Sequence, residues 1–142
     1  MDANLKFKDI TGKIIGASFE VHKFLGNGFQ EVIYQRALAI ELELMDIQFQ
    51  REHNMLIYYK ERQIGERRVD FFVEEKISVE IKAVTKLDNT NLNQAMNYLE
   101  AYNIEVGMLV NFGANSLEWK RLFNKKYNAM IGAKTKSVKS DK

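Results

Sequence analysis

The chain has 142 residues, of which 46% are hydrophobic and 28% charged, with a net charge of +2 and no cysteine. This length suits one domain with a sizeable core, and the composition is that of an ordinary globular protein. The lack of cysteine excludes disulfides and thiolate metal sites, while the isolated His22 and His53 exclude a histidine zinc site or triad by spacing. Without an apolar run of about 18 residues or a secretory signal, we expect a cytoplasmic protein that does not contact membranes.

Charge is distributed unevenly along the chain. Residues 125–142 contain six lysines against one aspartate, a net charge of +5, which leaves 15 basic and 18 acidic residues and a net charge of −3 over residues 1–124. We therefore expect one folded domain over 1–124 and a basic, disordered tail over 125–142. Such a tail either contacts nucleic-acid phosphates without sequence preference or only improves solubility.

Two amphipathic helices are predicted at the start, over residues 9–24 and 30–45, separated by the glycine-containing stop at 25–28. The second helix has an apolar stripe and a broader apolar flank, formed by Ile33, Ala37, Ile40 and Leu44 and by Tyr34, Leu38, Leu42 and Met45. At 100° per residue, Glu31 falls between Leu38 and Leu42, so its carboxylate is expected along a mostly buried flank. The alternative is that Glu31 only complements the helix dipole.

The rest of the chain predicts a sheet with one further helix. After a connector over 46–54, an apolar strand at 55–59 and a hairpin at 67–82 suggest a three-strand meander. A third helix, capped by Asp88, Asn89 or Thr90, is expected to run to Tyr102, before a strongly apolar strand at 105–112. This strand–helix–strand order favours a parallel crossover, and 117–123 is interpreted as a short edge strand.

The hairpin is the most informative segment, because its register follows from burial. Val69, Phe71 and Val73 alternate with Arg68, Asp70 and Phe72, and the apolar residues of 77–83 alternate with polar ones. A three-residue turn at 74–76 puts both apolar sets on one face. Asp70 then lies opposite Glu80, and Arg68 opposite Lys82. Two carboxylates at the roughly 4.5–5.5 Å of directly opposed residues repel each other and invite a cation. The alternative is a solvated checkerboard of diagonal charge pairs.

The polar residues expected on the flanks of the sheet and helices form an oxygen-only set: Glu31, Asp70, Glu80, Lys82, Gln94 and Tyr98. Carboxylates without histidine or cysteine suit Mg²⁺ or Mn²⁺. Such an ion activates water and stabilises a phosphoryl oxygen, and a nearby lysine orients that water or balances developing charge. Asp70, Glu80 and Lys82 therefore fit metal-assisted phosphodiester hydrolysis.

Several short segments, taken in order, resemble a known family. Residues 28–34 read G-x-x-E-x-x-Y, and 68–70 (Arg-Val-Asp), 80–82 (Glu-Ile-Lys) and 111–113 (Asn-Phe-Gly) follow. Over residues 8–124 the chain resembles the GxxExxY family of small bacterial and archaeal proteins, assigned to the PD-(D/E)xK nuclease-like superfamily, although Val69 stands where the superfamily name has proline. Gln94 and Tyr98 also resemble the QxxxY motif of RecB-like and lambda-exonuclease-like branches.

The resemblance implies an α/β fold, α+β by looser definitions, with a restriction-endonuclease-like α-β-β-β-α-β core and a mixed sheet flanked by helices. It also implies that Asp70, Glu80 and the backbone carbonyl of Ile81 bind the metal, that Glu31 ligates it or positions a metal-bound water, and that Lys82 is the catalytic lysine. Gln94, Tyr98 and Arg68 would position the substrate.

Three functions remain open at this stage. The first is a Mg²⁺-dependent nuclease acting on DNA or RNA, supported by the presence of every motif residue. The second is a non-catalytic domain that binds nucleic acid or protein, as a monomer or a homodimer. The third is a partner subunit or toxin-associated module whose chemistry depends on another chain. Fold alone does not decide among them.

Overall fold

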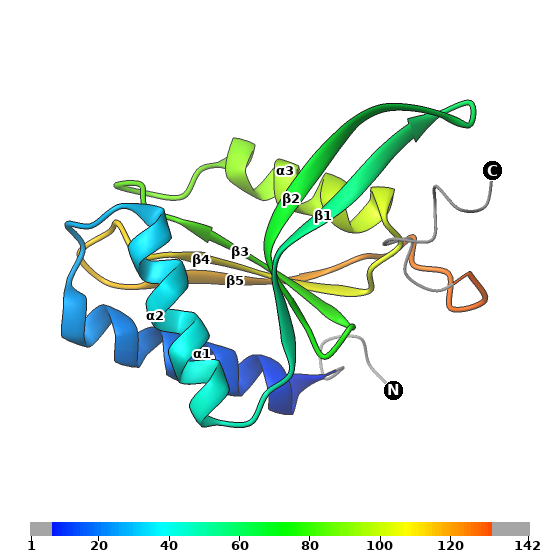
Figure 1. Cartoon of the computed structure of the whole chain (residues 1–142). Helices are drawn as coiled ribbons and strands as arrows, with labels where there is room; N and C mark the ends of the chain where they lie inside the picture. The colour runs from blue at the N-terminus through cyan, green and yellow to red at the C-terminus, as the bar shows by residue number, and fades with distance from the viewer. Residues whose placement is uncertain (1–6, 132–142) are drawn as a thin grey trace.

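The structure is a computed structural model that describes residues 7–131. Within this range the elements are α1 (Lys8–Leu25), α2 (Glu31–Leu44), β1 (Phe49–Tyr59), β2 (Arg62–Val73), β3 (Ile77–Lys82), α3 (Asn89–Ala101), β4 (Val106–Asn111) and β5 (Glu118–Phe123). A central sheet carries α1 and α2 on one side and α3 on the other (Figure 1). The predicted mixed α and β fold, a sheet flanked by helices, is confirmed.

The five strands form one sheet in the order β1-β2-β3-β4-β5. Only β3 and β4 pair in parallel, and α3 connects them; the other neighbouring pairs are antiparallel. The expected meander, the parallel crossover and the edge strand at the end of the domain are therefore all confirmed. The crossover needs a helix because parallel neighbours cannot be joined by a tight turn.

Each face of the sheet has its own apolar core. The larger core joins α1 and α2 to the sheet and contains fully buried side chains from both, including Ile14, Leu38 and Val79. The smaller core lies on the α3 side and includes Val69 and Leu99. Residues of β3 alternate between these faces, and all but the last are buried. Burial on both faces explains why β4 is a near-continuous apolar run, whereas β3 buries the polar Ser78 and Glu80 on its α3 side.

The first strand is longer than expected. We predicted a connector over 46–54, but β1 begins at Phe49 and pairs with β2 through Phe49–Val73 and Arg51–Phe71. The polar residues of this segment do not predict a strand, since it is the partner strand that supplies their backbone hydrogen bonds. The outer ends of β1 and β2 run beyond the other strands as an extended hairpin (Figure 1).

Strand β2 changes the face to which its apolar residues point. Phe71 and Val73 lie in the core beneath α1 and α2, as predicted, but Val69 and Phe72 belong to the core beneath α3. The expected alternation of Val69 with Phe71 is therefore wrong. The break lies beside Glu52 of β1, whose φ of +50° shows that the paired strand is irregular there. Sequence alternation cannot reveal such a bend, because it assumes a regular strand.

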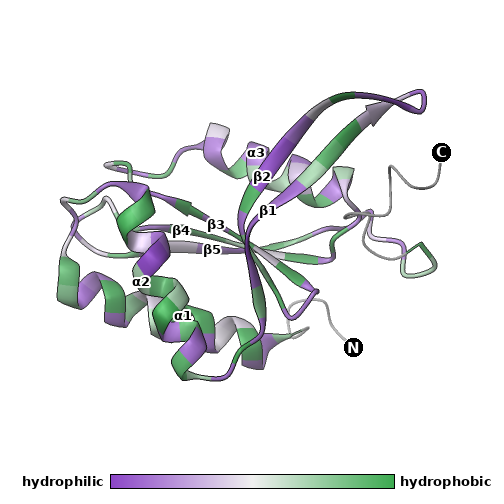
Figure 2. Ribbon diagram, viewed as in Figure 1, coloured by the Kyte–Doolittle hydropathy of each residue, from purple (hydrophilic) through white to green (hydrophobic). Residues whose placement is uncertain are grey.

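Helix α2 is rotated relative to the prediction. Its buried residues are Tyr34, Gln35, Leu38, Ala39 and Leu42. The stripe expected through Ile33 and Ala37 instead ends in exposed side chains, with Ile40 56% and Leu44 74% exposed. Figure 2 shows hydrophobic and hydrophilic stretches alternating along α1 and α2. Two apolar stripes on one helix leave its orientation undetermined, and the sheet selects one of them.

The hairpin turn follows the predicted register, with Val73 opposite Ile77 and Phe71 opposite Val79. Glu74 and Glu75 both take φ of +54°, a region that favours glycine or asparagine. Two contacts from outside the hairpin hold them: Glu74 N–H donates to the Gln48 carbonyl, and Glu74 Oε2 accepts the Gln48 N–H, both at 2.9 Å. Tertiary contacts thus compensate for unfavourable turn residues.

Part of the expected tail is held against the domain. The Asn103 side chain donates to the Asn128 carbonyl at 2.8 Å and accepts the Asn128 N–H at 2.9 Å. Disorder from residue 125 onward is therefore not what the structure has up to residue 131, and residues 132–142 lie outside the described range. None of the described helices is long and apolar enough to cross a membrane.

The β4–β5 loop fixes the path of the chain after β3. Asn111 is fully buried; its Oδ1 accepts the Val84 N–H and its Nδ2 donates to the Val84 carbonyl, each at 2.9 Å. Nδ2 also donates to Glu118, which helps to lower the pKa of that carboxyl. A Cβ on Gly113 would lie 2.5 Å from backbone atoms of Ala83 and Val84. The Asn-Phe-Gly segment therefore holds the backbone that directly follows Lys82 in place.

We expect Gly113→Ala to lower the free energy of unfolding by about 2–4 kcal/mol, because its Cβ overlaps backbone that cannot move as a side chain would. Chemical denaturation measures this. Gly28→Ala is the matched control: its Cβ meets nothing within 4 Å, so stability should change by no more than about 0.5 kcal/mol. Equal effects of the two substitutions would contradict the close approach.

Candidate functional site

The acidic motif residues and the lysine gather where β3 ends and α2 begins. Glu31 is the first residue of α2, Asp70 lies on β2, and Lys82 is the last residue of β3. The charges of Lys82, Asp70 and Glu80 all influence the pKa of Glu31. Three segments far apart in the sequence are thus brought to one end of the sheet.

The loop before α2 positions Glu31. Gly26, at the end of α1, has φ of +74° and ψ of −162°, a combination that is essentially restricted to glycine. Tyr34 Oη donates to the Gly26 carbonyl at 2.6 Å and accepts the Phe29 N–H at 3.1 Å. Its ring stacks on Phe112 at 4.7 Å. The tyrosine of G-x-x-E-x-x-Y therefore anchors the turn that leads to its glutamate, while nothing in the structure explains a requirement for glycine at Gly28.

The same loop touches the β4–β5 loop. His22 Nε2 lies 3.0 Å from the Ala114 carbonyl oxygen. Asn27 Nδ2 donates to Asn115 Oδ1 at 3.1 Å and to the Gly113 carbonyl at 3.5 Å. Because Gly113 packs on the chain directly after Lys82, the loops before Glu31 and after Lys82 are held through one shared neighbour.

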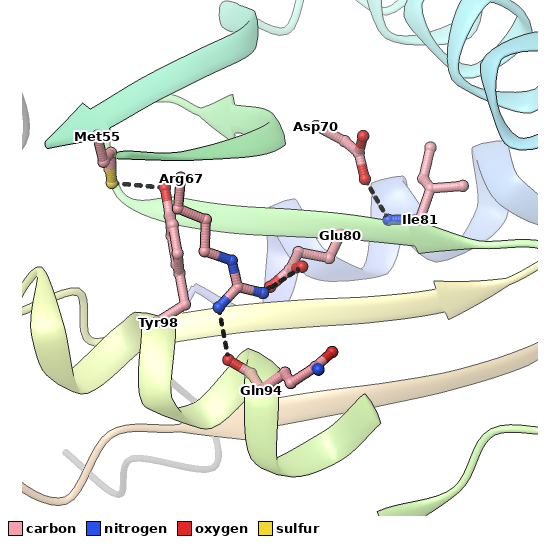
Figure 3. Close-up of polar contacts among 7 residues, drawn as sticks. All are labelled: Met55, Arg67, Asp70, Glu80, Ile81, Gln94 and Tyr98. Carbon is pink, nitrogen blue, oxygen red and sulfur yellow. Dashed lines mark hydrogen bonds and ion pairs between the residues drawn. The ribbon is translucent and has the colours of Figure 1, made fainter. Parts of the chain in front are cut away.

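Asp70 stands where β2 separates from β3 (Figure 3). The backbone pairing of the two strands ends at Phe71–Val79, and Asp70 Oδ2 instead accepts the N–H of Ile81 at 2.7 Å. The predicted direct opposition of Asp70 to Glu80, and of Arg68 to Lys82, is therefore not what the structure has, because β2 bends away with β1 into the extended hairpin. The carboxylate replaces a backbone partner at the point of separation.

Gln35 is a site residue that the sequence did not reveal. It is 5% exposed, and its Nε2 donates to Asp70 Oδ1 at 2.9 Å while its Oε1 accepts from Arg51 Nε at 3.1 Å. Gln35 lies four residues after Glu31, so both project from the same side of α2. That spacing in the sequence could have indicated Gln35 as a site residue. A polar residue one helical turn after the motif glutamate lies on the same side of the helix and can contact the same neighbouring groups.

Burial raises the pKa of both Asp70 and Glu31. For Asp70, the Ile81 N–H, the Gln35 amide and then Lys82 oppose this shift without reversing it. Glu31 is more exposed than its expected place on a buried flank, because it is the first residue of α2. Desolvation still raises its pKa, Lys82 and the Ala83 N–H lower it, and Asp70 adds repulsion. Bringing a positive charge to these two carboxyls would therefore be favourable.

Glu80 has a different partner. Arg67 Nη2 donates to Glu80 Oε1 at 3.0 Å and to Oε2 at 2.9 Å (Figure 3). The Glu80 side chain is 11% exposed and that of Arg67 30%. In the checkerboard alternative, the diagonal partner of Glu80 was Arg68. In the structure, Glu80 binds the neighbouring Arg67 instead. Both oxygens of Glu80 accept from a fully charged donor.

Helix α3 supports this arginine. Arg67 Nη1 donates to the Gln94 carbonyl at 3.0 Å, and the guanidinium carbon lies 5.1 Å from the centre of the Tyr98 ring. Tyr98 is 1% exposed and its hydroxyl donates to Met55 Sδ, in a setting where burial raises its pKa. Figure 3 shows the Gln94 side chain turned away from Arg67. Gln94 and Tyr98, the Q-x-x-x-Y pair, therefore hold Arg67 in place. A role of Gln94 and Tyr98 in positioning the substrate stays a prediction.

Arg68 lies apart from the acidic residues. Its Nε donates to Asn54 Oδ1 at 3.3 Å, and its Nη1 lies 3.9 Å from Glu52. Because 60% of the Arg68 side chain is exposed, its ion pair with Glu52 is a weak surface interaction along β1 and β2. A substrate role for Arg68 stays a prediction as well.

The donor set fits a hard divalent cation in chemistry but is not assembled around one. Asp70, Glu31 and Glu80 offer only carboxylate oxygens, the ligands that Mg²⁺ and Mn²⁺ prefer. Yet over residues 7–131 no three acidic or histidine side chains are arranged to hold one ion. The contacts give the reason: Glu80 is turned to Arg67, so only Asp70 and Glu31 face Lys82 together.

Comparison with known proteins agrees with this architecture. A solved structure, "Crystal structure of SSO0001", is similar with a TM-score of 0.51 and 18% sequence identity, over 89% of this chain and 64% of that one. The likeness concerns the fold, and this chain spans about 64% of the length of that protein. No curated protein matches the sequence. The family model described as "PD-(D/E)XK nuclease superfamily" matches residues 8–122. That match spans every element from α1 to all but the last residue of β5, and the chain belongs to the PD-(D/E)XK nuclease superfamily.

Proposed function

We propose that this protein is a Mg²⁺- or Mn²⁺-dependent nuclease that hydrolyses nucleic-acid phosphodiester bonds. The observation that carries the proposal is the meeting of Asp70, Glu31 and Lys82 where β3 ends, with the pKa of both carboxyls raised. Carboxyls whose pKa is raised, next to a lysine, cluster at binding and catalytic sites. Members of this superfamily usually use divalent metals.

Each residue has a role in the proposal. Asp70 and Glu31 would hold the ion, joined by Glu80 and the carbonyl of Ile81. When bound, a divalent cation supplies Lewis-acid stabilisation of a phosphoryl oxygen and lowers the pKa of water. Lys82 adds a fixed positive charge next to the carboxylates, suited to orienting water or balancing charge on the phosphate. Gln35 keeps Asp70 in place through its hydrogen bond to Oδ1.

The substrate end of the proposal rests on neighbouring residues. Gln94 is exposed on α3 near Arg67, and Arg68 is exposed on β2, so both are accessible to a phosphate backbone. Tyr98 would act indirectly, by holding the Arg67 guanidinium over its ring. The substrate class proposed is DNA or RNA, in a cytoplasmic setting. The homodimer considered from the sequence stays a prediction, for which light scattering is the measurement.

A second candidate, a non-catalytic nucleic-acid-binding domain of the same fold, is favoured by one observation. Both oxygens of Glu80 are engaged by Arg67, which neutralises a carboxylate that the nuclease proposal needs. In that case the Arg67–Glu80 pair would be a permanent part of the core. Cation binding separates the two candidates, because only the nuclease requires it.

Adding Mn²⁺ should raise Tm of the metal-free protein, and both Asp70→Asn and Glu80→Gln should abolish that increase, since each removes a charged ligand. Differential scanning fluorimetry with increasing Mn²⁺ measures it. Asp88→Asn is the matched control, because asparagine keeps the helix cap of Asp88 and the site is untouched. An increase in Tm that survives Asp70→Asn would refute the ligand assignment.

Without metal, the Tm of Asp70→Asn relative to the natural protein should be highest near neutral pH and should fall as the pH is lowered. Burial raises the folded-state pKa of Asp70 above its ordinary value, so protonation on acidification stabilises the natural protein but not the variant. That contribution is complete below the unfolded pKa and is lost as pH rises through the folded one. Thermal melts of both proteins in EDTA, from neutral to acidic pH, measure this difference in Tm. If the Tm of Asp70→Asn rose relative to that of the natural protein on acidification, the folded-state pKa of Asp70 would be lowered and not raised.

Lys82→Ala should reduce Mn²⁺-dependent cleavage of single- and double-stranded DNA and RNA by about 10²–10³-fold, through lost charge stabilisation. Its Mn²⁺-induced increase in Tm should persist, because lysine is not a ligand. Lys86→Ala, an exposed lysine four residues later, controls for general loss of positive charge. Full activity of Lys82→Ala would exclude the proposed role.

A further inference from the structure

We infer that Arg67 and a divalent cation compete for Glu80, so that Arg67 neutralises this carboxylate at rest and is displaced when the ion binds. The inference rests on the proposed function, whose ion would use the same carboxylate. It assigns a positioning role to an arginine outside the motif residues.

Asp70 and Glu80 have opposite kinds of partner. Asp70 accepts from two neutral groups, the Ile81 N–H and the Gln35 amide, so neither hydrogen bond brings a positive charge to its carboxylate. Glu80 accepts twice from one guanidinium nitrogen, at 3.0 and 2.9 Å, so its charge is compensated. A divalent ion near Asp70 therefore finds one carboxylate available and the other already neutralised.

Burial makes this neutralisation necessary. With its side chain 11% exposed, Glu80 would be a costly uncompensated charge if it were left without a partner. Both oxygens accept from Arg67, so an ion on their remaining lone pairs would lie beside the guanidinium. Repulsion between these two cations favours release of Arg67 when the ion binds. A cation that replaces the guanidinium satisfies the same requirement with one positive partner in place of another.

The other contacts of Arg67 allow it to release Glu80. Its side chain is 30% exposed, and its remaining contacts are the Gln94 carbonyl and the face of the Tyr98 ring. These contacts hold the guanidinium at the edge of α3 without needing Glu80. Once it is freed from the carboxylate, a planar guanidinium is suited to bidentate binding of a phosphate. Arg67 would then face the substrate side of the site.

The first test measures Mn²⁺ affinity from the electron paramagnetic resonance signal of free Mn²⁺, using the full chain. Arg67→Met keeps much of the side-chain length without charge, and should bind Mn²⁺ on the order of tenfold more tightly than the natural protein. Arg67→Lys keeps the charge but loses the fork geometry, so its affinity should lie between the two.

Arg68→Met is the matched control for this titration. It removes the same charge from the neighbouring position of β2, but Arg68 has its contacts on Asn54 and Glu52 and not on Glu80. Its Mn²⁺ affinity should change by less than about threefold, the size of a screened surface effect. Equal gains from Arg67→Met and Arg68→Met would reduce the effect to general charge and overturn the competition.

A second test follows the Arg67 side chain directly. In nuclear magnetic resonance spectra, the Nη2–H signal of Arg67, from the group that donates to Glu80, should be protected from exchange with water in EDTA; it is assigned by its loss in Arg67→Lys. Addition of Mg²⁺ should shift it and reduce that protection, whereas the signal of Arg68 should stay unchanged. An Arg67 signal that is unaffected at saturating Mg²⁺ would overturn the inference.

Stability gives an independent check on folding of the variant. In EDTA, Arg67→Met should lower Tm by roughly 5 °C or more, because Glu80 is left buried without a partner, and Arg67→Met with Glu80→Gln should recover much of that loss. Mn²⁺ should raise Tm more in Arg67→Met than in the natural protein.

The outcomes separate this inference from the nuclease proposal. If the natural protein binds Mn²⁺ and Arg67→Met binds it no better, the competition is wrong while the proposed function stands. If only Arg67→Met binds Mn²⁺, the competition is supported, and the natural protein is a domain that the arginine keeps metal-free. If neither binds the ion, both proposals fail.

Discussion

The hydrogen bond from the Ile81 N–H to the Asp70 carboxylate is the interaction on which the site depends. It forms where β2 leaves β3, because the backbone pairing stops at Phe71–Val79 and the next amide needs an acceptor. A buried N–H without a partner costs about 1–3 kcal/mol, so the carboxylate is both a structural cap and the group whose charge defines the site. Gln35 fixes its other oxygen and ties it to α2, one turn after Glu31.

The loops around this point form one connected support. Tyr34 anchors the turn before Glu31, Asn111 holds the chain after Lys82, and Asn27 reaches from the first loop to Gly113. Motif residues at distant positions in the sequence therefore act through direct contacts. Their spacing along the chain is a consequence of three segments meeting at one end of the sheet, and the fully buried rings of Tyr34 and Phe112 give this end a rigid base.

The two central carboxylates are balanced in different ways, and this difference matters more than their number. Asp70 is hydrogen-bonded by neutral groups while burial raises its pKa, so it favours an added positive charge. Glu80 already has one, supplied by Arg67 from its seat on α3. Desolvation of each acid by the same sheet produces both effects. A nuclease of this superfamily that keeps an arginine on its second carboxylate would gain stability at rest and give up cation affinity.

Sequence by itself determined the strand order around the hairpin, the register of its turn and the parallel crossover, because periodicity and burial constrain local elements strongly. It also supplied the family, through ordered motifs. Tertiary structure alone decided which stripe of α2 is buried, where β2 changes face, that Gln35 holds Asp70, and that Glu80 meets Arg67 and not Asp70. These depend on a bend in β2 beside the irregular Glu52 and on packing across the sheet. A pattern read along one chain assumes regular elements, so it cannot show which of two neighbouring arginines the folded sheet turns toward a buried carboxylate.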